Sequence, residues 1–333
     1  MTKKKPLILI TEKYSDEAFY KLKNSNLVDV EKIFSTEQLH ELLPKATGLI
    51  IRSQTHINQQ ILNRASSLQF IITCTSGFDH INLELTQKHQ IKVMYTPDAN
   101  AQSAAELTWG LVLDTNRHIS SADRSLRQSS LSQTGWIRNQ FEGRELSGLT
   151  YGVIGLGRIG QKVAQFAKAF GLEVIVYDPY QEDHIFTSLA LDRSSYEEVL
   201  KQSDIISFHV PLTPETKNML NRSHFEYTNK DLVVINTSRG SIINEEDLIM
   251  ALENNLISAA GLDVYQKEPL SYNSKLLQIK NVVLTQHMGA LTQKAFQKAS
   301  DEACELCLDY IKNLKTRNTL PLKNNWGSLT FND

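Results

Sequence analysis

The chain has 333 residues, which is enough for two domains because single hydrophobic cores stop growing beyond about 250–300 residues. A formal net charge of -2 and an ordinary content of charged and hydrophobic residues give no support to binding of nucleic acid or of an anionic membrane. The three cysteines follow no disulfide framework and predict a cytoplasmic location, and the apolar stretch 6–10 is too short for a signal sequence or a membrane span.

In the first hundred residues, short apolar runs alternate with amphipathic stretches. They predict strands at 7–10, 48–51, 68–73 and 92–95, and helices at 15–22, 36–43 and 58–64. Runs of β-branched residues without polar alternation are typical of strands that are buried on both faces. We therefore predict a parallel sheet that is covered by helices.

A long helix is predicted from residue 103 to about 118, before a polar stretch that contains Trp136 and Phe141. A second series of strands and helices then begins. Its predicted strands are 151–154, 173–177, 205–209, 232–236, 260–264 and 282–285, and its helices include 161–170, 196–201 and 245–253. Asn244 is the predicted N-cap of the last helix, with Asp247 as a weak capping-box partner. Six strands with helical crossovers make a full doubly wound sheet.

A final helix, 295–314, follows after this sheet is complete, and such a helix commonly returns to cover the other domain. We therefore predict an α/β fold of two doubly wound parallel-sheet domains. A Rossmann domain, residues 103–292, is inserted into a discontinuous substrate domain, residues 1–102 and 293–333. Cys304 and Cys307 lie in the final helix, where two small apolar residues on a packed face are favoured over a redox or zinc site, so no metal is predicted.

A dinucleotide-binding fingerprint follows the strand predicted at 151–154 and opens the next helix. Its glycines permit a tight turn, a close approach of the backbone to a pyrophosphate, and packing of helix on strand, while the helix start offers N–H groups to the phosphates. An acid follows about 20 residues later, where it bonds the adenosine ribose and favours NAD over NADP. Arg158 either contacts a phosphate or faces solvent. The predicted cofactor ligands are Gly155, Gly157, Arg158, Ile159, Gly160 and Asp178.

Three polar residues, Arg239, Glu268 and His287, end later strands or follow them in loops. Arginine can bond a carboxylate and a carbonyl together, histidine can deliver a proton near neutral pH, and a carboxylate can hold the imidazole in place. Singly, each has another interpretation: a surface ion pair, a structural histidine or a solvated loop. Together, beside a nicotinamide site, they indicate hydride transfer to or from an α-keto acid.

These motifs resemble the D-isomer-specific 2-hydroxyacid dehydrogenases over nearly the whole chain. The matching segments are 100–107 (NAQSAAEL), 149–160, 209–216 (HVPLTPET), 262–265 (LDVY) and 268–269 (EP). The resemblance implies the Arg239, Glu268 and His287 roles given above, a flavodoxin-like substrate domain, and a homodimer built through the NAD domains.

Further residue roles follow from the same resemblance. The substrate carboxylate is expected near the backbone N–H groups of Ser76 and Gly77. His209, Thr237 and Asp263 are expected to line the nicotinamide half of the site, and Thr216 lies in the loop on that side. Two positions depart from the family. Gln286 stands where proline usually precedes the catalytic histidine, and Asn82 stands where aspartate is common, which predicts a local capping change.

The segments 51–56 and 289–295 are most similar to those of 3-phosphoglycerate dehydrogenases, in which an arginine matching Arg52 helps to bind the substrate phosphate. The favoured activity is therefore oxidation of 3-phosphoglycerate or the reverse reduction, as in serine biosynthesis. The alternatives are a glyoxylate/hydroxypyruvate reductase, a general D-2-hydroxyacid reductase, or an NAD(H)-sensing scaffold protein. A single arginine gives little cover for a phosphate dianion.

Overall fold

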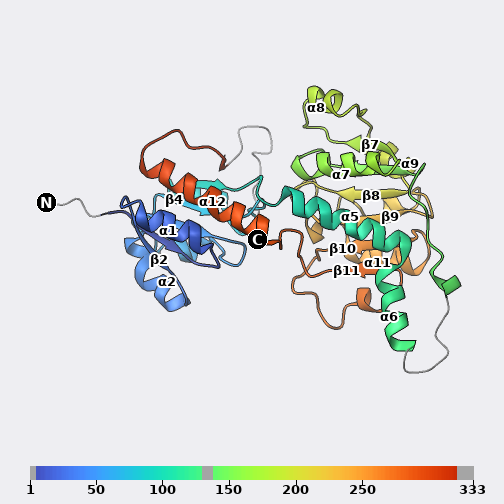
Figure 1. The fold of residues 1–333 in the computed structure, drawn as a ribbon, viewed down its shortest axis with the longest axis horizontal. Helices are drawn as coiled ribbons and strands as arrows, with labels where there is room; N and C mark the ends of the chain where they lie inside the picture. Colours follow the sequence, from blue (N-terminus) through green and yellow to red (C-terminus); the bar gives the residue numbers. More distant parts are fainter. Residues whose placement is uncertain (1–4, 130–137, 321–333) are drawn as a thin grey trace. The chain divides into compact units, whose positions relative to one another are not determined.

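The computed structural model describes residues 5–129 and 138–320. The chain divides into two compact units (Figure 1). The first unit comprises Met1–Asn100 and Ala290–Asp333, and the second unit comprises Ala101–Gly289. Trp136, which the sequence analysis noted, lies outside the described residues. Among the described residues, no helix combines the length and the apolar character needed to cross a bilayer.

The first unit is built on a six-stranded sheet with the order β12-β5-β4-β3-β1-β2. The strands β1 to β5 are parallel and follow the 2-1-3-4-5 order of flavodoxin-like folds. The elements of this unit are β1 (Leu7–Ile10), α1 (Asp16–Asn24), β2 (Asp29–Lys32), α2 (Thr36–Leu42), η1 (Leu43–Lys45), β3 (Gly48–Ile51), α3 (Gln59–Leu62), β4 (Phe70–Thr73), α4 (Leu83–Lys88), β5 (Lys92–Tyr95), α12 (Gln293–Ile311) and β12 (Thr319–Leu320).

Of the strands and α-helices described in the first unit, three were not predicted. β2 and β12 are edge strands, and β2 alternates between exposed and half-buried residues, so it lacks the continuous apolar run of a buried strand. β12 pairs antiparallel with β5, which corrects the expectation of a purely parallel sheet. The short helix α4 was also missed, although its N-cap follows the prediction: the Asn82 side chain accepts a hydrogen bond from the Leu85 N–H at 3.0 Å.

The helix α12 covers one face of the first sheet beside α1 (Figure 1). Its buried residues include Ala303, Cys304 and Cys307, which pack in one core cluster with Ile8 and Phe70. The predicted packing of the two cysteines on a helix face is therefore confirmed. Burial raises the pKa of the Cys304 thiol to about 11, so this sulfur is a protonated, apolar group at neutral pH.

The second unit contains all six strands that the sequence predicts, in the order β11-β10-β9-β8-β6-β7, and all are parallel. An isolated parallel bridge between Val176 and Arg193 continues the sheet beyond β7. With that bridge in the place of a third strand, the order is 3-2-1-4-5-6-7, which is the 3-2-1-4-5-6 winding of Rossmann folds with β11 added as a seventh strand. The elements are α5 (Ala101–Arg117), α6 (Ile119–Ser129), η2 (Arg138–Phe141), β6 (Thr150–Ile154), α7 (Arg158–Ala169), β7 (Glu173–Tyr177), α8 (Asp183–Ser188), α9 (Tyr196–Gln202), β8 (Ile205–Phe208), α10 (Arg222–Phe225), β9 (Val233–Asn236), η3 (Gly240–Ile242), α11 (Glu245–Glu253), β10 (Ala259–Leu262), η4 (Lys275–Gln278) and β11 (Val282–Leu284).

Helices cover both faces of this sheet, and each face has its own core. α5 and α7 contribute Trp109 and Val163 to one core cluster, while α9 and α11 contribute Val199 and Leu248 to the other. The long helix predicted at 103–118 is α5, and it ends one residue before His118, which has a left-handed φ of 54°. A second helix, α6, begins at once in the polar stretch, for which no helix was predicted.

The start of α11 shows one correct and one incorrect capping prediction. Asn244 is the N-cap, and its side chain accepts a hydrogen bond from the Asp247 N–H at 3.1 Å. The capping box is absent, because the Asp247 carboxylate instead accepts a hydrogen bond from the Arg222 N–H at 3.0 Å. The short helix α8 was not predicted at all.

Candidate active site

The turn after β6 has the geometry that the fingerprint predicts. Gly155 has a φ of +95°, and a Cβ at this position would lie 3.0 Å from the backbone of His209. A Cβ on Gly160 would lie 2.0 Å from the carbonyl oxygen of Gly155. At both positions, close approach of the backbone requires glycine.

Gly157 has open space around it, since a Cβ there would meet no atom within 4 Å. It is the N-cap of α7, and no side-chain hydrogen bond caps this helix, whose first residues are Arg158 and Ile159. The first N–H groups of a helix attract anions through their unpaired donors and through the helix dipole. The start of α7 therefore fits the pyrophosphate of a dinucleotide.

Asp178 follows β7 and is buried. One carboxylate oxygen accepts a hydrogen bond from the Leu156 N–H at 2.7 Å. The other accepts from the N–H groups of Tyr180 and Gln181, at 2.9 and 3.0 Å. A carboxylate has about four acceptor positions, so one remains for a ribose hydroxyl. Asp178 thus joins the fingerprint loop to its own turn and still has the capacity that the cofactor prediction requires.

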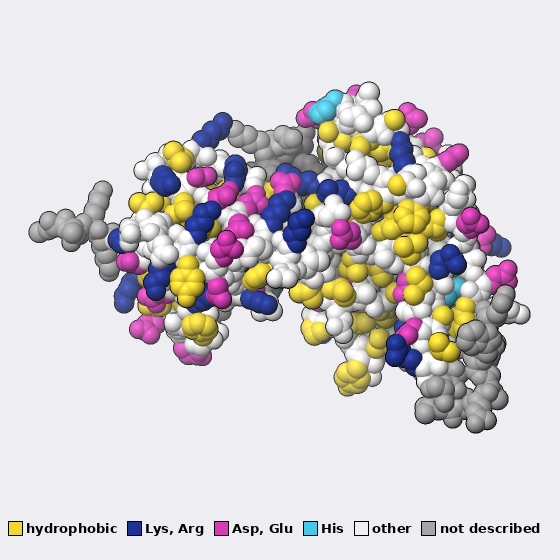
Figure 2. Space-filling model, viewed as in Figure 1, with side chains coloured by type: hydrophobic (Ala, Val, Ile, Leu, Met, Phe, Trp, Pro, Cys, Tyr) yellow, Lys and Arg dark blue, Asp and Glu magenta, His cyan; other side chains and the backbone are white. Residues whose placement is uncertain are grey.

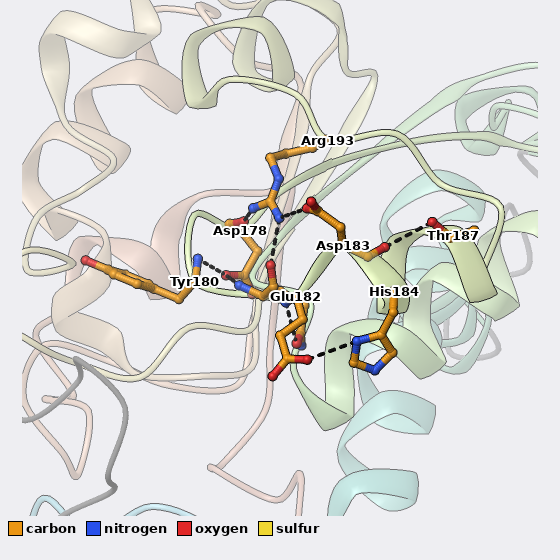
Figure 3. Close-up of polar contacts among 8 residues, drawn as sticks. Asp178, Tyr180, Glu182, Asp183, His184, Thr187 and Arg193 are labelled. Atoms are coloured by element: carbon orange, nitrogen blue, oxygen red, sulfur yellow. Dashed lines mark hydrogen bonds and ion pairs between the residues drawn. The ribbon is translucent and has the colours of Figure 1, made fainter.

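The turn after Asp178 also contacts Arg193, which sequence reasoning did not single out (Figure 3). The guanidinium of Arg193 donates to the carbonyl oxygens of Asp178 and Gln181, and it forms an ion pair with the Asp183 carboxylate at 2.9 Å. The same group lies over the Phe186 ring, 4.4 Å from its centroid. No motif marks Arg193, because only the crossover between β7 and α9 brings it to this turn.

His209 follows β8 and lies behind the fingerprint turn. Its Nε2 hydrogen-bonds the Ser207 hydroxyl at 2.8 Å, whereas its Nδ1 is buried and has no hydrogen-bond partner among the described residues. Burial lowers the pKa of His209 to about 3, so the ring is neutral at working pH. A buried polar atom without a partner costs free energy unless a ligand satisfies it. This atom is consistent with the predicted contact to a cofactor.

Two further predicted cofactor residues lie at the same edge of the sheet. The Thr237 hydroxyl hydrogen-bonds the Thr108 hydroxyl of α5 at 2.7 Å. The Thr216 hydroxyl donates to the carbonyl oxygen of Pro211 at 2.6 Å and accepts from the Thr213 N–H at 2.8 Å. Thr216 thus holds its own loop together and Thr237 ties the end of β9 to α5, while their contacts to the cofactor stay predictions.

The structure brings His287 and Glu268 together. The Nδ1 atom of His287 lies 2.6 Å from a carboxylate oxygen of Glu268, and the other oxygen accepts a hydrogen bond from the Tyr265 N–H at 3.1 Å. Burial raises the pKa of Glu268, but the hydrogen bonds from His287 and from the Tyr265 N–H, with the charges of His287 and Arg239, outweigh it and hold the pKa below its ordinary value. Glu268 is therefore ionised at neutral pH and fixes the orientation of the ring.

Asp263 holds the loop that carries His287. Its fully buried carboxylate accepts hydrogen bonds from the Thr285 hydroxyl at 2.6 Å and from the N–H groups of Met288 and Gly289 at 2.8 and 2.9 Å. His287 itself has a left-handed φ of 51°, which is costly for a residue other than glycine and requires support from its surroundings. Sequence reasoning placed Asp263 beside the nicotinamide and missed this supporting role.

Arg239 lies in the loop between β9 and η3. Its Nη1 donates to the carbonyl oxygen of Ser238 at 2.7 Å, and Asn236 accepts from both the N–H and the hydroxyl of Ser238. A Cβ on Gly240 would lie 1.9 Å from the backbone carbon of Tyr265, so the Arg239 loop packs directly on the loop that leads to Glu268. All three predicted catalytic residues therefore belong to loops at the carboxyl edge of the second sheet.

The predicted substrate residues Ser76 and Gly77 follow β4 in the first unit. The single proton of the Ser76 hydroxyl has two acceptors within reach, the Asn100 side-chain oxygen and, at 3.2 Å, the Pro97 carbonyl oxygen. The Gly77 carbonyl oxygen accepts from the Thr75 hydroxyl at 2.7 Å. These bonds involve side chains and carbonyl oxygens, so within the described part of the chain they do not occupy the N–H groups of Ser76 and Gly77, which are the donors that the prediction needs.

Arg52 follows β3 in the same unit. The Glu12 carboxylate accepts hydrogen bonds from the N–H groups of Arg52 and Thr55, both at 2.9 Å, so a residue without a sequence motif orders this loop. The Arg52 guanidinium lies 5.4 Å from the centroid of the Phe296 ring, and its Nη1 is buried and has no partner among the described residues. Lys13 lies over the same ring, with its Nζ 5.2 Å from the centroid. The structure thus places a second cation at this ring.

The second unit combines a Rossmann sheet, a complete dinucleotide turn and polar loops at one edge, which defines the chain as a dinucleotide-binding α/β protein. Residues 109–289, more than half of the chain, match the model of the D-isomer specific 2-hydroxyacid dehydrogenase NAD binding domain. The chain belongs to the D-isomer specific 2-hydroxyacid dehydrogenase family, and its cofactor is NAD.

Three relatives illustrate the range of the similarity. D-3-phosphoglycerate dehydrogenase of Methanocaldococcus jannaschii is 36% identical over 95% of this chain. Hydroxypyruvate reductase of Thermotoga maritima is 35% identical over 89% of this chain and 95% of its own length. The structure of D-lactate dehydrogenase from Aquifex aeolicus with NAD and lactic acid has a TM-score of 0.80 and 27% identity, and covers 92% of this chain and 96% of its own. The chain spans only 59–60% of the length of three phosphoglycerate dehydrogenases that it matches.

Proposed function

We propose that this protein is an NAD-dependent dehydrogenase that interconverts a 2-keto acid and the corresponding D-2-hydroxy acid. The observation that carries the proposal is the 2.6 Å contact between His287 Nδ1 and the Glu268 carboxylate, on loops of the NAD-binding unit. The nicotinamide supplies or accepts the hydride when it is bound. A ring held at Nδ1 by a carboxylate keeps Nε2 for the substrate, and in the protonated state it can give that proton to the carbonyl oxygen.

Arg239 has the complementary role in this proposal. Its guanidinium is planar and permanently charged, so it can bond the substrate carboxylate and the carbonyl oxygen together. Charge that develops on the carbonyl oxygen during reduction is then stabilised by Arg239 and removed by the proton from His287. Ser76 and Gly77 of the first unit are the proposed donors to the carboxylate.

The proposed substrate is 3-phosphoglycerate in one direction and 3-phosphohydroxypyruvate in the other, which belongs to serine biosynthesis in the cytoplasm. A phosphate dianion needs more than one cation, and Lys13 supplies the second beside Arg52. The unpartnered Nη1 of Arg52 supports a ligand there. Relatives named D-3-phosphoglycerate dehydrogenase, at 33–36% identity, support the same assignment.

Hydroxypyruvate reduction is the second candidate, because the relative of that name is 35% identical over 95% of its own length. Hydroxypyruvate lacks the phosphate, so the two activities differ in their need for Arg52 and Lys13. NADH oxidation should be measured with 3-phosphohydroxypyruvate, hydroxypyruvate, glyoxylate and pyruvate. The proposal expects the highest kcat/KM with the phosphorylated acid.

Lys13→Ala is expected to raise the KM for 3-phosphohydroxypyruvate by about tenfold, because one charged contact to the phosphate is lost. The KM for glyoxylate should stay unchanged. Lys32→Ala is a matched control, since Lys32 lies 4.7 Å from the centroid of another ring, that of Phe19. Equal KM changes for both acids would assign Lys13 a structural role.

For the wild-type protein, NADH binding without turnover of any acid in the panel would favour an NAD(H)-sensing protein over an enzyme.

Glu268→Gln is expected to move the alkaline limit of keto-acid reduction to lower pH. Glu268 carries a charge at neutral pH because its pKa lies below the ordinary value, and this charge favours the protonated imidazole of His287. A neutral amide no longer does so, and the proton needed for reduction is lost at lower pH. The measurement is kcat/KM for reduction between about pH 5 and pH 10. Glu245→Gln is the control, because Glu245 contacts the same loop through the Gln266 N–H at 3.1 Å. An unshifted limit in Glu268→Gln would contradict the assignment.

We further propose that the protein is a homodimer joined through the NAD-binding unit. Hydrophobic side chains gather on the face of this unit that carries α5 (Figure 2). Ile119 at the start of α6 and Phe170 at the end of α7 are 56% and 47% exposed, and an interface over this face would remove their apolar surface from water. Sedimentation equilibrium should give twice the chain mass of 37.7 kDa, and a mass of one chain would contradict the proposal.

A further inference from the structure

Three acidic residues between the end of β7 and the start of α8 lie close to one arginine, Arg193, which follows α8 (Figure 3). Asp178 is buried, Glu182 pairs with His184 at 3.0 Å, and Asp183 pairs with Arg193 at 2.9 Å. The accepted reason for a preference for NAD over NADP is the single acid at the end of the strand, here Asp178. In this chain the turn also binds the cation Arg193, and the positive charge of Arg193 is paired with the carboxylate of Asp183.

The guanidinium of Arg193 is fixed at this turn by the backbone. The parallel bridge with Val176 and the hydrogen bond from the Ser194 N–H to the Val176 carbonyl oxygen, at 2.8 Å, place Arg193 beside the end of β7. Its terminal nitrogens then bond the carbonyl oxygens of Asp178 and Gln181. The positive charge therefore contacts the backbone of Asp178, the same residue whose carboxylate is expected to bond the ribose.

The ion pair with Asp183 is the weak part of this arrangement. The Asp183 side chain is 96% exposed and that of Arg193 is 36% exposed, so water screens their attraction. Two of the three polar contacts of Arg193 go to carbonyl oxygens, and a guanidinium has five N–H groups. The group can therefore bind another anion without leaving the turn.

We propose that Arg193 is a latent ligand for a 2′-phosphate, and that Asp178 and Asp183 together keep it from binding NADP. Asp178 repels the phosphate directly, and Asp183 neutralises the cation that would attract it. The discrimination is then a property of a three-residue set, and removal of Asp178 alone unmasks a site that depends on Arg193. This inference concerns the cofactor and holds whichever acid is the substrate.

The test is a titration of the full chain with NADH and with NADPH, in which binding is detected by the quenching of protein fluorescence. The readout is the ratio of the two Kd values. Asp178→Ala is expected to shift this ratio toward NADPH by about tenfold, because a buried like charge is removed. Asp178→Ala/Asp183→Asn should shift the ratio toward NADPH by about a further threefold, which is the effect expected from the loss of one solvent-screened ion pair. Asp178→Ala/Arg193→Gln should lose the gain, whereas Asp178→Ala/Arg193→Lys should keep most of it.

Glu182→Gln in the Asp178→Ala background is the matched control, since Glu182 precedes Asp183 and contacts His184 instead of Arg193. A ratio in Asp178→Ala/Arg193→Gln equal to that in Asp178→Ala would overturn the proposal. An equal loss of NADH and NADPH affinity on changing Arg193 would also overturn it, because that result means that Arg193 only supports the turn. Equal effects of Asp183→Asn and Glu182→Gln would remove the masking role. Because binding is measured directly, an enzyme that turns over none of the tested acids would refute the proposed substrate and leave this test intact.

Discussion

His287→Ala is expected to reduce kcat for keto-acid reduction by about 10²–10⁴, the usual contribution of a positioned general acid. NADH should bind as tightly as to the wild type, because the fingerprint loop, Asp178 and His209 are unchanged. An imidazole is the side-chain type suited to proton transfer near neutral pH, and here its Nδ1 is held 2.6 Å from the Glu268 carboxylate. Single-turnover kinetics and NADH titration together separate the chemical step from cofactor binding.

His287→Asn is the matched variant for this prediction. The backbone at His287 is left-handed, with a φ of 51°, and asparagine tolerates this region better than alanine. An asparagine side chain cannot transfer a proton, so the loss should be as large as for alanine. Activity close to wild type in His287→Asn would mean that the loop geometry matters and the imidazole does not.

Arg239→Ala is expected to raise the KM for the keto acid and to lower kcat together, with kcat/KM reduced by about 10²–10⁴. Two charge-assisted hydrogen bonds are lost, each worth about 1.5–3 kcal/mol. The pKa of Glu268 should also rise, because the charge of Arg239 is one of the causes that lower it. Arg239→Lys keeps the charge and loses the planar pair of donors. Its kcat/KM should therefore lie between those of the wild type and Arg239→Ala.

The control for Arg239 is Arg222→Ala. Arg222 belongs to α10 of the same unit, and its backbone contact to Asp247 does not depend on its side chain. This variant should keep wild-type kinetics. A wild-type KM for the keto acid in Arg239→Ala would remove the proposed carboxylate contact.

The buried strands of both units were predictable because apolar, β-branched runs have one favourable location, the middle of a covered sheet. β2 was not, since an edge strand that faces solvent has an ordinary polar sequence. α6 was missed for a related reason: none of its described residues is buried, so it has no apolar stripe of core residues. A hydrophobic pattern therefore predicts the elements that bury side chains in a core, and it does not predict those that face solvent.

Prediction of the site was limited in a similar way. Gly155, Asp178 and the Arg239 loop lie within motifs whose spacing has a local physical cause. By contrast, Arg193 reaches the Asp178 turn only through the sheet, and Glu12, which follows β1, orders the Arg52 loop after β3. These contacts join residues that are far apart in sequence, and the side chains that make them carry no local signal.

The position of α12 in the chain has a consequence for synthesis on the ribosome. Ile8, Phe70 and other apolar residues of the first sheet are covered by α12, which follows the whole second unit. At about 5–20 residues per second, the second unit takes about 10–40 s to make. The second unit can therefore fold first, while the N-terminal strands emerge with one face uncovered and must wait, or be protected by a chaperone, until the last helix is made.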